Sequence, residues 1–350
     1  MRHSTEGARA GPAAAAAVAV LTVAAATLPA CRRSADEFRT FHGEAMSTRW
    51  EVVIEDRPGA EEAAAAVFSR LVALERELSE WRTGSPLSAV NRAAGGAAVE
   101  VPADLFRLLE RSRELGQATD GAFDVTWAAL WGLWDFRSPA PRVPDAAEVA
   151  ARAALVDYRR IELDADGRTV RLPAAGMMMG LGGIAKGYAL DRVAEMLTGA
   201  GFRDFLVTGG GQVLSRGRRG DRAWRVGIRD PRGGPEEFFA RLEIGDASLS
   251  TSADNESFFV VDGVRYHHVL DPRTGWPSRG LRSATVMAAD ATLADALSTA
   301  VMVLGRERGL EVARRLDAEA LVVDARGRVA MTSGLETRIE RLWPPREAGR

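Results

Sequence analysis

Residues 179–188 read MGLGGIAKGY, a glycine-rich turn that leads into an amphipathic helical pattern over residues 186–197. Clustered glycines mark places where the backbone approaches a ligand or another segment closely. The start of a helix, with backbone amides pointing outward and Lys186 nearby, suits a phosphate group. The spacing fits neither the Walker motif nor the dinucleotide-binding fingerprint, so phosphate binding and a purely structural turn both remain open.

The segment over residues 266–275, YHHVLDPRTG, ends a strand-like stretch in a turn that contains proline. Neighbouring residues of a strand face opposite sides, so one of His267 and His268 can face a site while the other faces the core or solvent. No Cys, His or Glu stands at the spacing of a zinc site with them. The pair therefore suggests a base or a hydrogen-bonding group, with a structural histidine as the alternative.

A third cluster, ADALSTA over residues 294–300, lies within an apolar helical pattern. In a helix, Asp295, Ser298 and Thr299 project from one face. A carboxylate with hydroxyl groups suits a hard cation such as Mg²⁺, which prefers oxygen ligands and often completes its shell with substrate phosphates. The alternative is a capping carboxylate with two hydroxyls bonded back to the helix.

The composition is that of a folded protein without a general basic field. The chain has 350 residues, of which 46% are hydrophobic and 27% are charged, and its formal net charge is -2. This balance argues against disorder, and we expect no nucleic-acid partner. The single cysteine excludes an internal disulfide and a cysteine zinc cluster.

The first 31 residues are organised like a bacterial lipoprotein signal. Arg2 and Arg9 precede an apolar run over residues 13–26, and Leu-Pro-Ala-Cys follows at residues 28–31. We expect a signal peptide over residues 1–30 and a lipidated Cys31. The protein would then be anchored by lipid to a membrane of the bacterial cell envelope, facing the periplasm or the cell exterior. An uncleaved transmembrane helix over residues 13–30 is the alternative.

Strand-like and helix-like stretches alternate from residue 38 onward. The expected strands are 48–54 and 205–208, the expected helices are 60–78, 105–115, 186–197, 292–304 and 306–316, and the expected hairpins are 161–172, 258–268 and one that turns at 326–327. This order predicts an α/β fold of the mixed α+β kind, with much antiparallel sheet. Residues 138–144 hold three prolines and form a linker or a surface loop, after which Asp145 is expected to cap a short helix.

Taken in order, these clusters and several other motifs resemble the ApbE family, the FAD:protein FMN transferases. The motifs are AMST (45–48), LSEW (78–81), SPLSAVN (85–91), DGAFDVT (120–126), WG (131–132), residues 181–191, TGGG (208–211), WRVGIRDP (224–231), STS (250–252), residues 268–275 and residues 295–299. The resemblance covers nearly all of the chain beyond the signal segment. It implies one ApbE-like flavin transferase domain over residues 38–345, with mixed and antiparallel sheets, helices, and an FAD cleft between two interleaved halves.

The resemblance implies a Mg²⁺-dependent enzyme that cleaves the FAD pyrophosphate, releases AMP and attaches FMN through a phosphoester to a Thr or Ser hydroxyl of an acceptor protein. It implies His268 as the general base and Lys186 beside the pyrophosphate. The implied metal positions are the Gly183 carbonyl, Asp295, Thr299 and the adjacent Ser298. The positions that match FAD-contacting residues are Met46, Trp81, Ala122, Phe123, Asp124, Gly180 and Val269. Core packing is the alternative role for these, above all for Phe123 and Val269.

The acceptors that the resemblance implies are membrane redox subunits with a short flavinylation motif that contains Ser or Thr. Three positions depart from the family pattern: Gly180, where many members have Asp; Ala253, where Gly is usual; and Trp81, where a smaller aromatic residue is frequent. None of them removes a metal position or His268, so we expect an active enzyme. A Mg²⁺-dependent FAD pyrophosphatase that yields FMN and AMP, and a non-catalytic FAD-binding lipoprotein, are the alternative functions.

Overall fold

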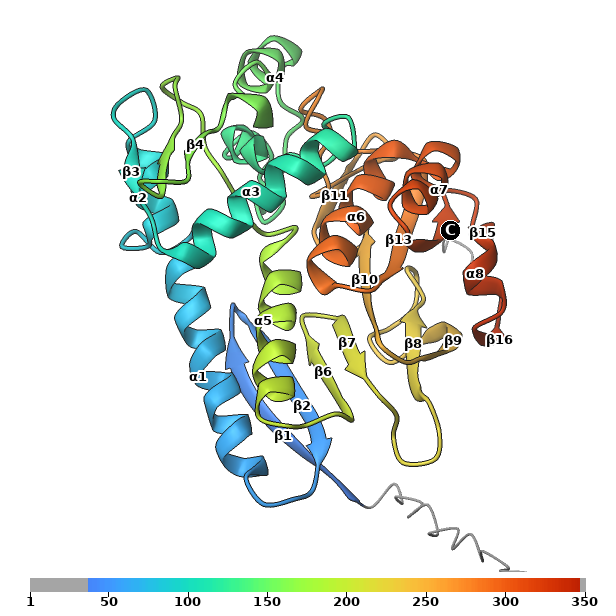
Figure 1. The fold of residues 1–350 in the computed structure, drawn as a ribbon. Helices are drawn as coiled ribbons and strands as arrows, with labels where there is room; N and C mark the ends of the chain where they lie inside the picture. Colours follow the sequence, from blue (N-terminus) through green and yellow to red (C-terminus); the bar gives the residue numbers. More distant parts are fainter. Residues whose placement is uncertain (1–36, 347–350) are drawn as a thin grey trace, which may run out of the picture. The chain divides into compact units, whose positions relative to one another are not determined.

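An eight-stranded antiparallel sheet forms the centre of the computed structural model, which describes residues 37–346 (Figure 1). From edge to edge its strands are β1 (Phe38–Ala45), β2 (Thr48–Glu55), β6 (Phe205–Gly209), β7 (Gln212–Arg216), β10 (Ala247–Ala253), β13 (Leu281–Ala288), β14 (Glu319–Asp324) and β15 (Val329–Met331). The predicted signal peptide and Cys31 lie outside the described residues. Within residues 37–346, no helix combines the length and the apolarity that crossing a bilayer requires.

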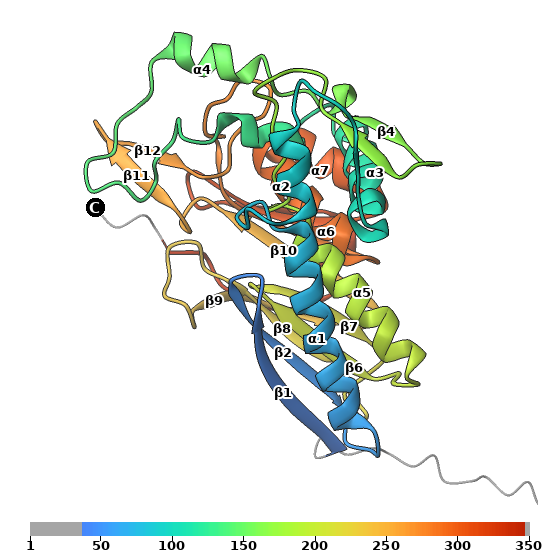
Figure 2. The ribbon, with the colours of Figure 1, turned by 90° about the vertical axis from the view of Figure 1, so that its left-hand side faces the viewer.

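Helices cover one face of this sheet. Figures 1 and 2 show α1 (Ala60–Leu78) and α5 (Ala185–Gly199) side by side over the sheet, with α6 (Ala291–Leu304) beyond α5. The apolar stripe predicted for α1 is buried, and it consists of Val67, Leu71, Leu74 and Leu78. The helix therefore forms because its apolar residues recur at helical spacing and pack against the strands beneath.

The other face of the sheet packs on a smaller sheet. Its strands, in order, are β16 (Ile339–Leu342), β9 (Phe238–Ile244) and β8 (Trp224–Arg229). Burial alternates along β8, where Trp224, Val226 and Ile228 face inward. Within β2, Val52 belongs to the core beneath the helices and Val53 to the core between the two sheets. Because successive side chains of a strand point to opposite faces of the sheet, β2 contributes side chains to both cores.

The remaining elements complete this framework. They are α2 (Pro86–Arg92), β3 (Val99–Glu100), α3 (Ala103–Ala118), the 3-10 helix η2 (Val125–Leu130), α4 (Ala146–Ala153), the 3-10 helix η3 (Tyr158–Arg160), β4 (Glu162–Asp164), β5 (Thr169–Arg171), β11 (Phe258–Val261), β12 (Val264–His267), α7 (Arg306–Arg315) and α8 (Ser333–Glu336). Residues 138–144 form a loop inside one compact unit and not a linker between domains. Asp145 caps α4 as predicted, accepting the Ala147 N–H at 2.8 Å.

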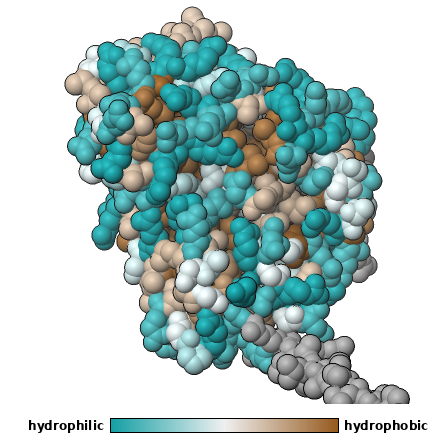
Figure 3. Space-filling view, viewed as in Figure 1, coloured by the Kyte–Doolittle hydropathy of each residue, from teal (hydrophilic) through white to brown (hydrophobic). Residues whose placement is uncertain are grey.

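The structure confirms the mixed α+β class with antiparallel sheets. Every strand pair among the described residues is antiparallel, so the mixed sheets that the resemblance implied do not occur in this part of the chain. Several neighbouring strands follow each other through short turns, which only antiparallel pairing permits. The face in Figure 3 is largely hydrophilic, with hydrophobic side chains in small patches, because most of the apolar side chains lie in the cores.

A cluster of aromatic side chains packs the β11–β12 hairpin against the segment after η2. The Trp134 ring stacks on Tyr266 with 5.6 Å between ring centroids and meets Trp276 edge-on at 5.2 Å. Trp134 Nε1 also donates to the Gly275 carbonyl at 2.9 Å. Because His268 directly follows β12, this cluster helps to fix where His268 lies.

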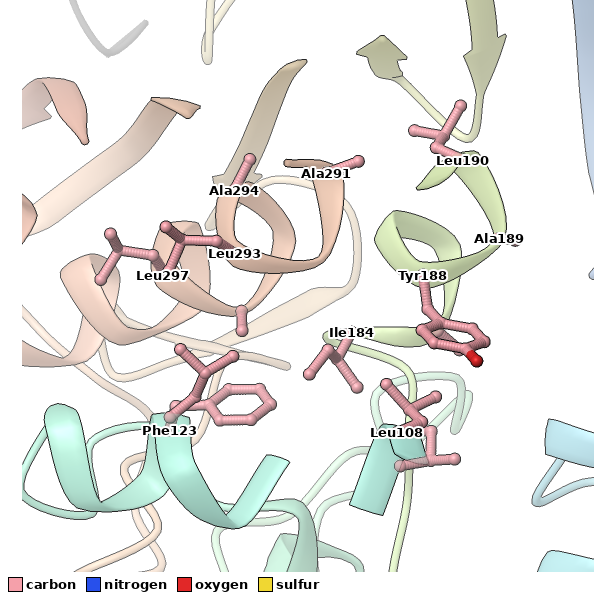
Figure 4. Packing of buried hydrophobic residues seen from close by; sticks show 14 of the residues in the cluster. Leu108, Phe123, Ile184, Tyr188, Ala189, Leu190, Ala291, Leu293, Ala294 and Leu297 are labelled. Atoms are coloured by element: carbon pink, nitrogen blue, oxygen red, sulfur yellow. The ribbon is translucent and has the colours of Figure 1, made fainter. Parts of the chain in front are cut away.

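A buried carboxylate links three helices on the covered face. Asp104 of α3 accepts hydrogen bonds from the Tyr188 hydroxyl of α5 at 2.6 Å, from Arg107 at 2.8 Å and from Arg70 of α1. Burial favours a higher pKa for Asp104, but these donors outweigh it and lower the pKa to about 2. Burial and the bond to Asp104 raise the pKa of Tyr188 to about 12. Figure 4 shows the Tyr188 hydroxyl turned away from α6.

Helices α5 and α6 meet at Gly187 with no room for a side chain. A Cβ on Gly187 would lie 2.2 Å from the Ala291 carbonyl oxygen and 2.7 Å from Asp295 Cβ. One turn along α5, Asp191 accepts the N–H groups of Ala291 and Thr292 at 2.8 and 2.9 Å and so caps the start of α6. These contacts hold Asp295 beside the first turn of α5.

Replacing Tyr188 by Phe removes one donor to the buried Asp104, and we expect the free energy of unfolding at pH 7 to fall by about 1–3 kcal/mol. The loss should be smaller at pH 3, because a carboxyl group with a lowered pKa gives its full stabilisation only above its pKa in the unfolded chain, about 4, and this contribution fades as the pH falls from there through about 2. Urea unfolding of both proteins at the two pH values measures the difference. An equal loss at pH 7 and pH 3 would contradict the role of the Asp104 carboxylate.

Replacing Gly187 by Ala should force α5 and α6 apart, and we expect a loss of about 1–3 kcal/mol or more in the free energy of unfolding. The matched control is Gly199→Ala at the other end of α5, where a Cβ would meet nothing within 4 Å. We expect the control to be neutral or slightly stabilising. Urea unfolding compares the two variants, and equal stabilities would show that the helices do not depend on the contact at Gly187.

Candidate active site

The first turn of α5 brings Lys186 to the centre of the candidate site. Lys186 Nζ donates to the Gly182 carbonyl at 3.3 Å. Its side chain packs against the β6–β7 turn, where a Cβ on Gly210 would lie 2.8 Å from Lys186 Cδ. Gly210 has a φ of 58°, so both the backbone conformation and the lysine contact favour glycine there.

Three of the amides around the glycine turn already have partners. The N–H groups of residues 181–182 hydrogen-bond to the Glu80 carboxylate, and the Gly187 N–H donates to Asp295 Oδ2 at 2.9 Å. The sequence suggested outward-pointing amides that could bind a phosphate group, but these three amides are not free. Because side chains from other segments accept hydrogen bonds from these amides, the Lys186 ammonium is the group here that would attract an anion.

Asp295 is the buried acidic group of the site. Its side chain lies on α6, and the residue is only 4% exposed. Besides the Gly187 N–H, the Gln212 side chain hydrogen-bonds to the carboxylate. Burial raises the pKa of Asp295, whereas the charge of Lys186 and these hydrogen bonds oppose the rise. A buried carboxylate near a single ammonium group is a position that a further cation would stabilise.

Thr299 of α6 lies against Gly183 of the glycine turn. A Cβ on Gly183 would lie 3.3 Å from Thr299 Oγ1, and Thr299 follows Asp295 by one helical turn. Ser298 is fully buried, and its hydroxyl donates to the Asp295 carbonyl at 2.9 Å and pairs with Ser252 Oγ at 2.8 Å. Ser298 thus ties α6 to β10. The Thr299 hydroxyl contacts the glycine turn and also lies 3.3 Å from Ser252 Oγ of β10.

This set of donors fits a divalent cation that prefers oxygen. A carboxylate, a hydroxyl and a backbone carbonyl are hard ligands of the kind that Mg²⁺ binds. In residues 37–346, no group of three or more His, Cys, Asp or Glu side chains forms a metal site, so a cation here would depend on the mixed oxygen set. Gln212 Oε1 is buried without a hydrogen-bond partner in the described chain. A buried oxygen without a partner costs free energy, and a cation or a water bound to the cation would remove this cost.

The two neighbouring histidines lie in different environments, as strand alternation predicts. His267 is 4% exposed, and its Nε2 lies 2.8 Å from the Ser278 carbonyl oxygen. His268 is exposed on one side. Protein crowds its other sides closely enough that desolvation, with the charge of Lys186 as a further contribution, lowers the pKa of His268. His268 is therefore neutral at pH 7.

Three indole rings form a feature that we call the tryptophan ledge (Trp81, Trp127 and Trp131). Trp81 is 73% exposed, and its ring centroid lies 4.3 Å from that of Trp131 with 32° between the ring planes. Trp127 meets Trp131 edge-on at 6.0 Å, and its Nε1 donates to the Gly180 carbonyl at 3.1 Å. The ledge connects Trp81 to the glycine turn and leaves Trp81 accessible to a flat ring.

Three of the predicted FAD contacts lie in the core. Ala122, Phe123 and Val269 are all buried within the main hydrophobic cluster. Phe123 lies below α6 in Figure 4, and a Cβ on Gly183 would be 3.6 Å from its ring. Phe123 therefore supports the glycine turn from beneath, and packing explains Ala122 and Val269 as well.

Asp124 and Met46 have local structural roles. Asp124 accepts the N–H groups of Thr126 and Tyr158, both at 2.8 Å, and so caps η2 and joins it to η3. Met46 occupies the β1–β2 turn with a φ of 52°, and its N–H donates to Glu75 Oε2 at 2.9 Å. The Asp124 carboxylate is thus engaged by the protein itself.

Sequence reasoning missed three residues that build the site, namely Glu80, Asp191 and Gln212. Glu80 lies in the LSEW motif and Asp191 in α5, but neither pattern shows which backbone amides they accept. Gln212 directly follows Gly209-Gly210-Gly211, and a polar residue after such a turn was a usable signal. The contacts of all three are tertiary, so spacing alone does not reveal them.

Comparison with known proteins places the chain in a family. Residues 46–322 match the model of the ApbE family. The chain is 36% identical to the FAD:protein FMN transferase of Treponema pallidum over 308 residues, which cover 83% of this chain and 85% of that protein. It is 33% identical to a FAD:protein FMN transferase of Klebsiella pneumoniae over 284 residues, or 81% of this chain and 88% of that protein.

Solved structures agree with the sequence comparison. The ApbE protein of Thermotoga maritima superimposes with a TM-score of 0.78 at 31% identity, covering 89% of this chain and all of that chain. The flavinyl transferase ApbE of Pseudomonas stutzeri, in its apo form, gives a TM-score of 0.77 at 31% identity, covering 86% of this chain and 96% of that chain. The prediction from the order of the motifs is confirmed: this chain belongs to the ApbE family of flavin transferases.

Proposed function

We propose that this chain transfers the FMN half of FAD to a Thr or Ser hydroxyl of an acceptor protein and releases AMP. The observation that carries the proposal is the convergence of Asp295, Thr299, Gly183, Lys186 and His268 from three separate segments. The relatives from Treponema pallidum and Klebsiella pneumoniae are named for this reaction. These residues would supply the charges and the base that such a transfer needs.

Asp295, Thr299 and the Gly183 carbonyl are the residues that would hold Mg²⁺. When bound, the cation supplies positive charge that offsets the diphosphate charge and favours departure of the AMP phosphate. Lys186 contributes a second positive charge beside the glycine turn. Ser298 and Gln212 keep the oxygen donors in place, Ser298 through β10 and Gln212 through the Asp295 carboxylate.

His268 would accept the proton of the acceptor hydroxyl. The hydroxyl oxygen then bonds to the phosphorus of the FMN half, while the bond from that phosphorus to the bridging oxygen breaks. AMP leaves with the bridging oxygen, so one phosphoester replaces one phosphoanhydride. The lowered pKa of His268 keeps the base neutral at pH 7, and the rate should fall once the pH drops below that pKa, which lies under the usual value of about 6.5.

The exposed parts of the site suit the two larger substrates. Trp81 offers an accessible ring for the isoalloxazine system of FAD. The exposed side of His268 leaves an approach for the acceptor protein, for which we propose membrane redox subunits. The same exposure favours a second candidate function, hydrolysis of FAD to FMN and AMP, because water can reach His268 by the same route.

Incubating the protein with FAD, Mg²⁺ and a flavin-accepting domain distinguishes these functions. We expect the intact mass of the acceptor to increase by one FMN phosphoester, with AMP released in equal amount. AMP release together with free FMN and an unmodified acceptor would establish the hydrolase instead. Bound FAD without any AMP would leave only flavin binding.

Variants of the site test the assigned roles. Asp295→Ala should lower transfer at least about a hundredfold by removing the carboxylate that would hold the cation. His268→Ala should lower it about a hundredfold to ten-thousandfold by removing the base. The matched controls, Asp166→Ala in an exposed hairpin turn and His42→Ala on β1, should retain transfer. Transfer at the control rate in either site variant would refute the role of that residue.

We propose further that the protein is a lipoprotein of the bacterial cell envelope, facing the periplasm or the cell exterior. The support is the charged start, the apolar run and the cysteine at residues 1–31. A lipid anchor would keep the enzyme at the membrane where redox subunits reside.

Replacing Cys31 by Ser should prevent lipidation and release the protein from the membrane fraction. Labelling cells with a palmitate analogue and fractionating them measures both effects. Labelled wild-type protein beside unlabelled, soluble Cys31→Ser protein supports the anchor. An unlabelled wild type, or a variant that stays in the membrane, would favour the uncleaved transmembrane helix.

A further inference from the structure

A carboxylate from another segment occupies the amides of the glycine turn. Glu80 is half-buried and accepts hydrogen bonds from the N–H groups of Leu181 and Gly182. A Cβ on Gly182 would lie 3.5 Å from Glu80 Oε1, so the turn and the carboxylate are in contact. The charge of Lys186 acts on the same carboxylate. Glu80 therefore interacts with both features that would otherwise attract a phosphate group.

The start of α2 holds the segment that carries Glu80. Ser88 Oγ donates to the Glu80 carbonyl at 3.4 Å, and Ser85 Oγ donates to the Ser79 carbonyl at 2.6 Å. Ser85 is also the N-cap of α2 and accepts the Ser88 N–H at 3.0 Å. These hydrogen bonds hold the segment in place. Glu80 therefore contacts the glycine turn, and the next residue, Trp81, lies in the tryptophan ledge.

We propose that Glu80 is a positioning residue that holds the glycine turn and makes binding of the FAD diphosphate depend on a divalent cation. The inference rests on the proposed function. By engaging the amides and opposing the Lys186 charge, the carboxylate prevents the diphosphate from binding tightly to the turn alone. It also steadies the turn that places Gly183 against Thr299.

The formal charges of the site explain this dependence. Lys186 carries one positive charge, whereas Glu80 and Asp295 carry one negative charge each when they are ionised. With both carboxylates ionised, a diphosphate meets a site with a net negative charge unless a divalent cation is present. Without the Glu80 carboxylate the site is neutral and two amides are free, and both changes favour an anion.

The test measures FAD affinity by fluorescence quenching for the full chain and for Glu80→Gln and Glu80→Ala, first in EDTA and then in Mg²⁺. In EDTA both variants should bind FAD about fivefold to tenfold more tightly than the wild type, because a repelling charge has gone. In Mg²⁺, AMP release should fall about tenfold in Glu80→Ala, because the turn is no longer held. Glu80→Gln should lose less, since its amide oxygen still accepts from the turn.

The control is Glu62→Gln, on the exposed first turn of α1, which should match the wild type in both conditions. Wild-type FAD affinity in EDTA for both Glu80 variants would overturn the proposal. A parallel fall in FAD affinity and melting temperature would also overturn it, because structural damage alone gives that result. If the wild type neither released AMP nor modified an acceptor, the proposed function would fail, yet the comparison in EDTA would still decide the role of Glu80.

Discussion

The contact between α5 and α6 at Gly187 is the constraint on which the site depends. The helices approach so closely that the Gly187 N–H reaches the Asp295 carboxylate at 2.9 Å. Asp191 reinforces the approach by capping α6. A larger residue at position 187 would separate the acidic group on α6 from the ammonium group on α5. The glycine is thus required by packing, and the chemistry follows from that packing.

Lys186 connects the charged groups that this contact brings together. Its charge acts on Glu80, Asp295 and His268, which come from three different segments. It opposes the rise in pKa that burial causes at the two carboxylates, and it adds to the fall in pKa at the histidine. The carboxylates are thereby kept closer to their ionised form and the histidine closer to its neutral form, which are the forms that the proposed cation binding and the proposed base catalysis require.

Elements with a one-sided burial pattern could be predicted from the sequence. The bounds of α1 agree with its apolar stripe, and the β11–β12 hairpin with its Asp-Gly turn. In contrast, β13 is buried at all eight positions and β10 is rich in serine, so neither shows the alternation that identifies a strand. The sheet of β8, β9 and β16 was also missed: the strict alternation of β8 was a usable signal for a strand, whereas β16 pairs with β9 from a distant part of the chain.

In the candidate site, the sequence predicted only what depends on the spacing of neighbouring residues. Helical spacing placed Asp295, Ser298 and Thr299 on one face, but it does not show that both hydroxyls pair with Ser252 of β10, Ser298 at 2.8 Å and Thr299 at 3.3 Å. That pairing depends on the order of strands in the sheet, which no local pattern contains. The same holds for Glu80 and Gln212, whose partners lie far away in the sequence.

The contacting segments lie far apart in the sequence, and this separation affects how the protein folds. Gly187 and Asp295 are 108 residues apart in the sequence, and β2 pairs with β6, which also lies far along the chain. A fold with many such non-local contacts has a high contact order and forms slowly compared with a helical bundle of similar size. A growing chain that has completed α5 still lacks Asp295 and Thr299 of α6, two of the residues that we propose would hold the cation. The proposed site is therefore complete only when the fold is complete, and a truncated chain that stops before α6 would lack the acidic group of that site.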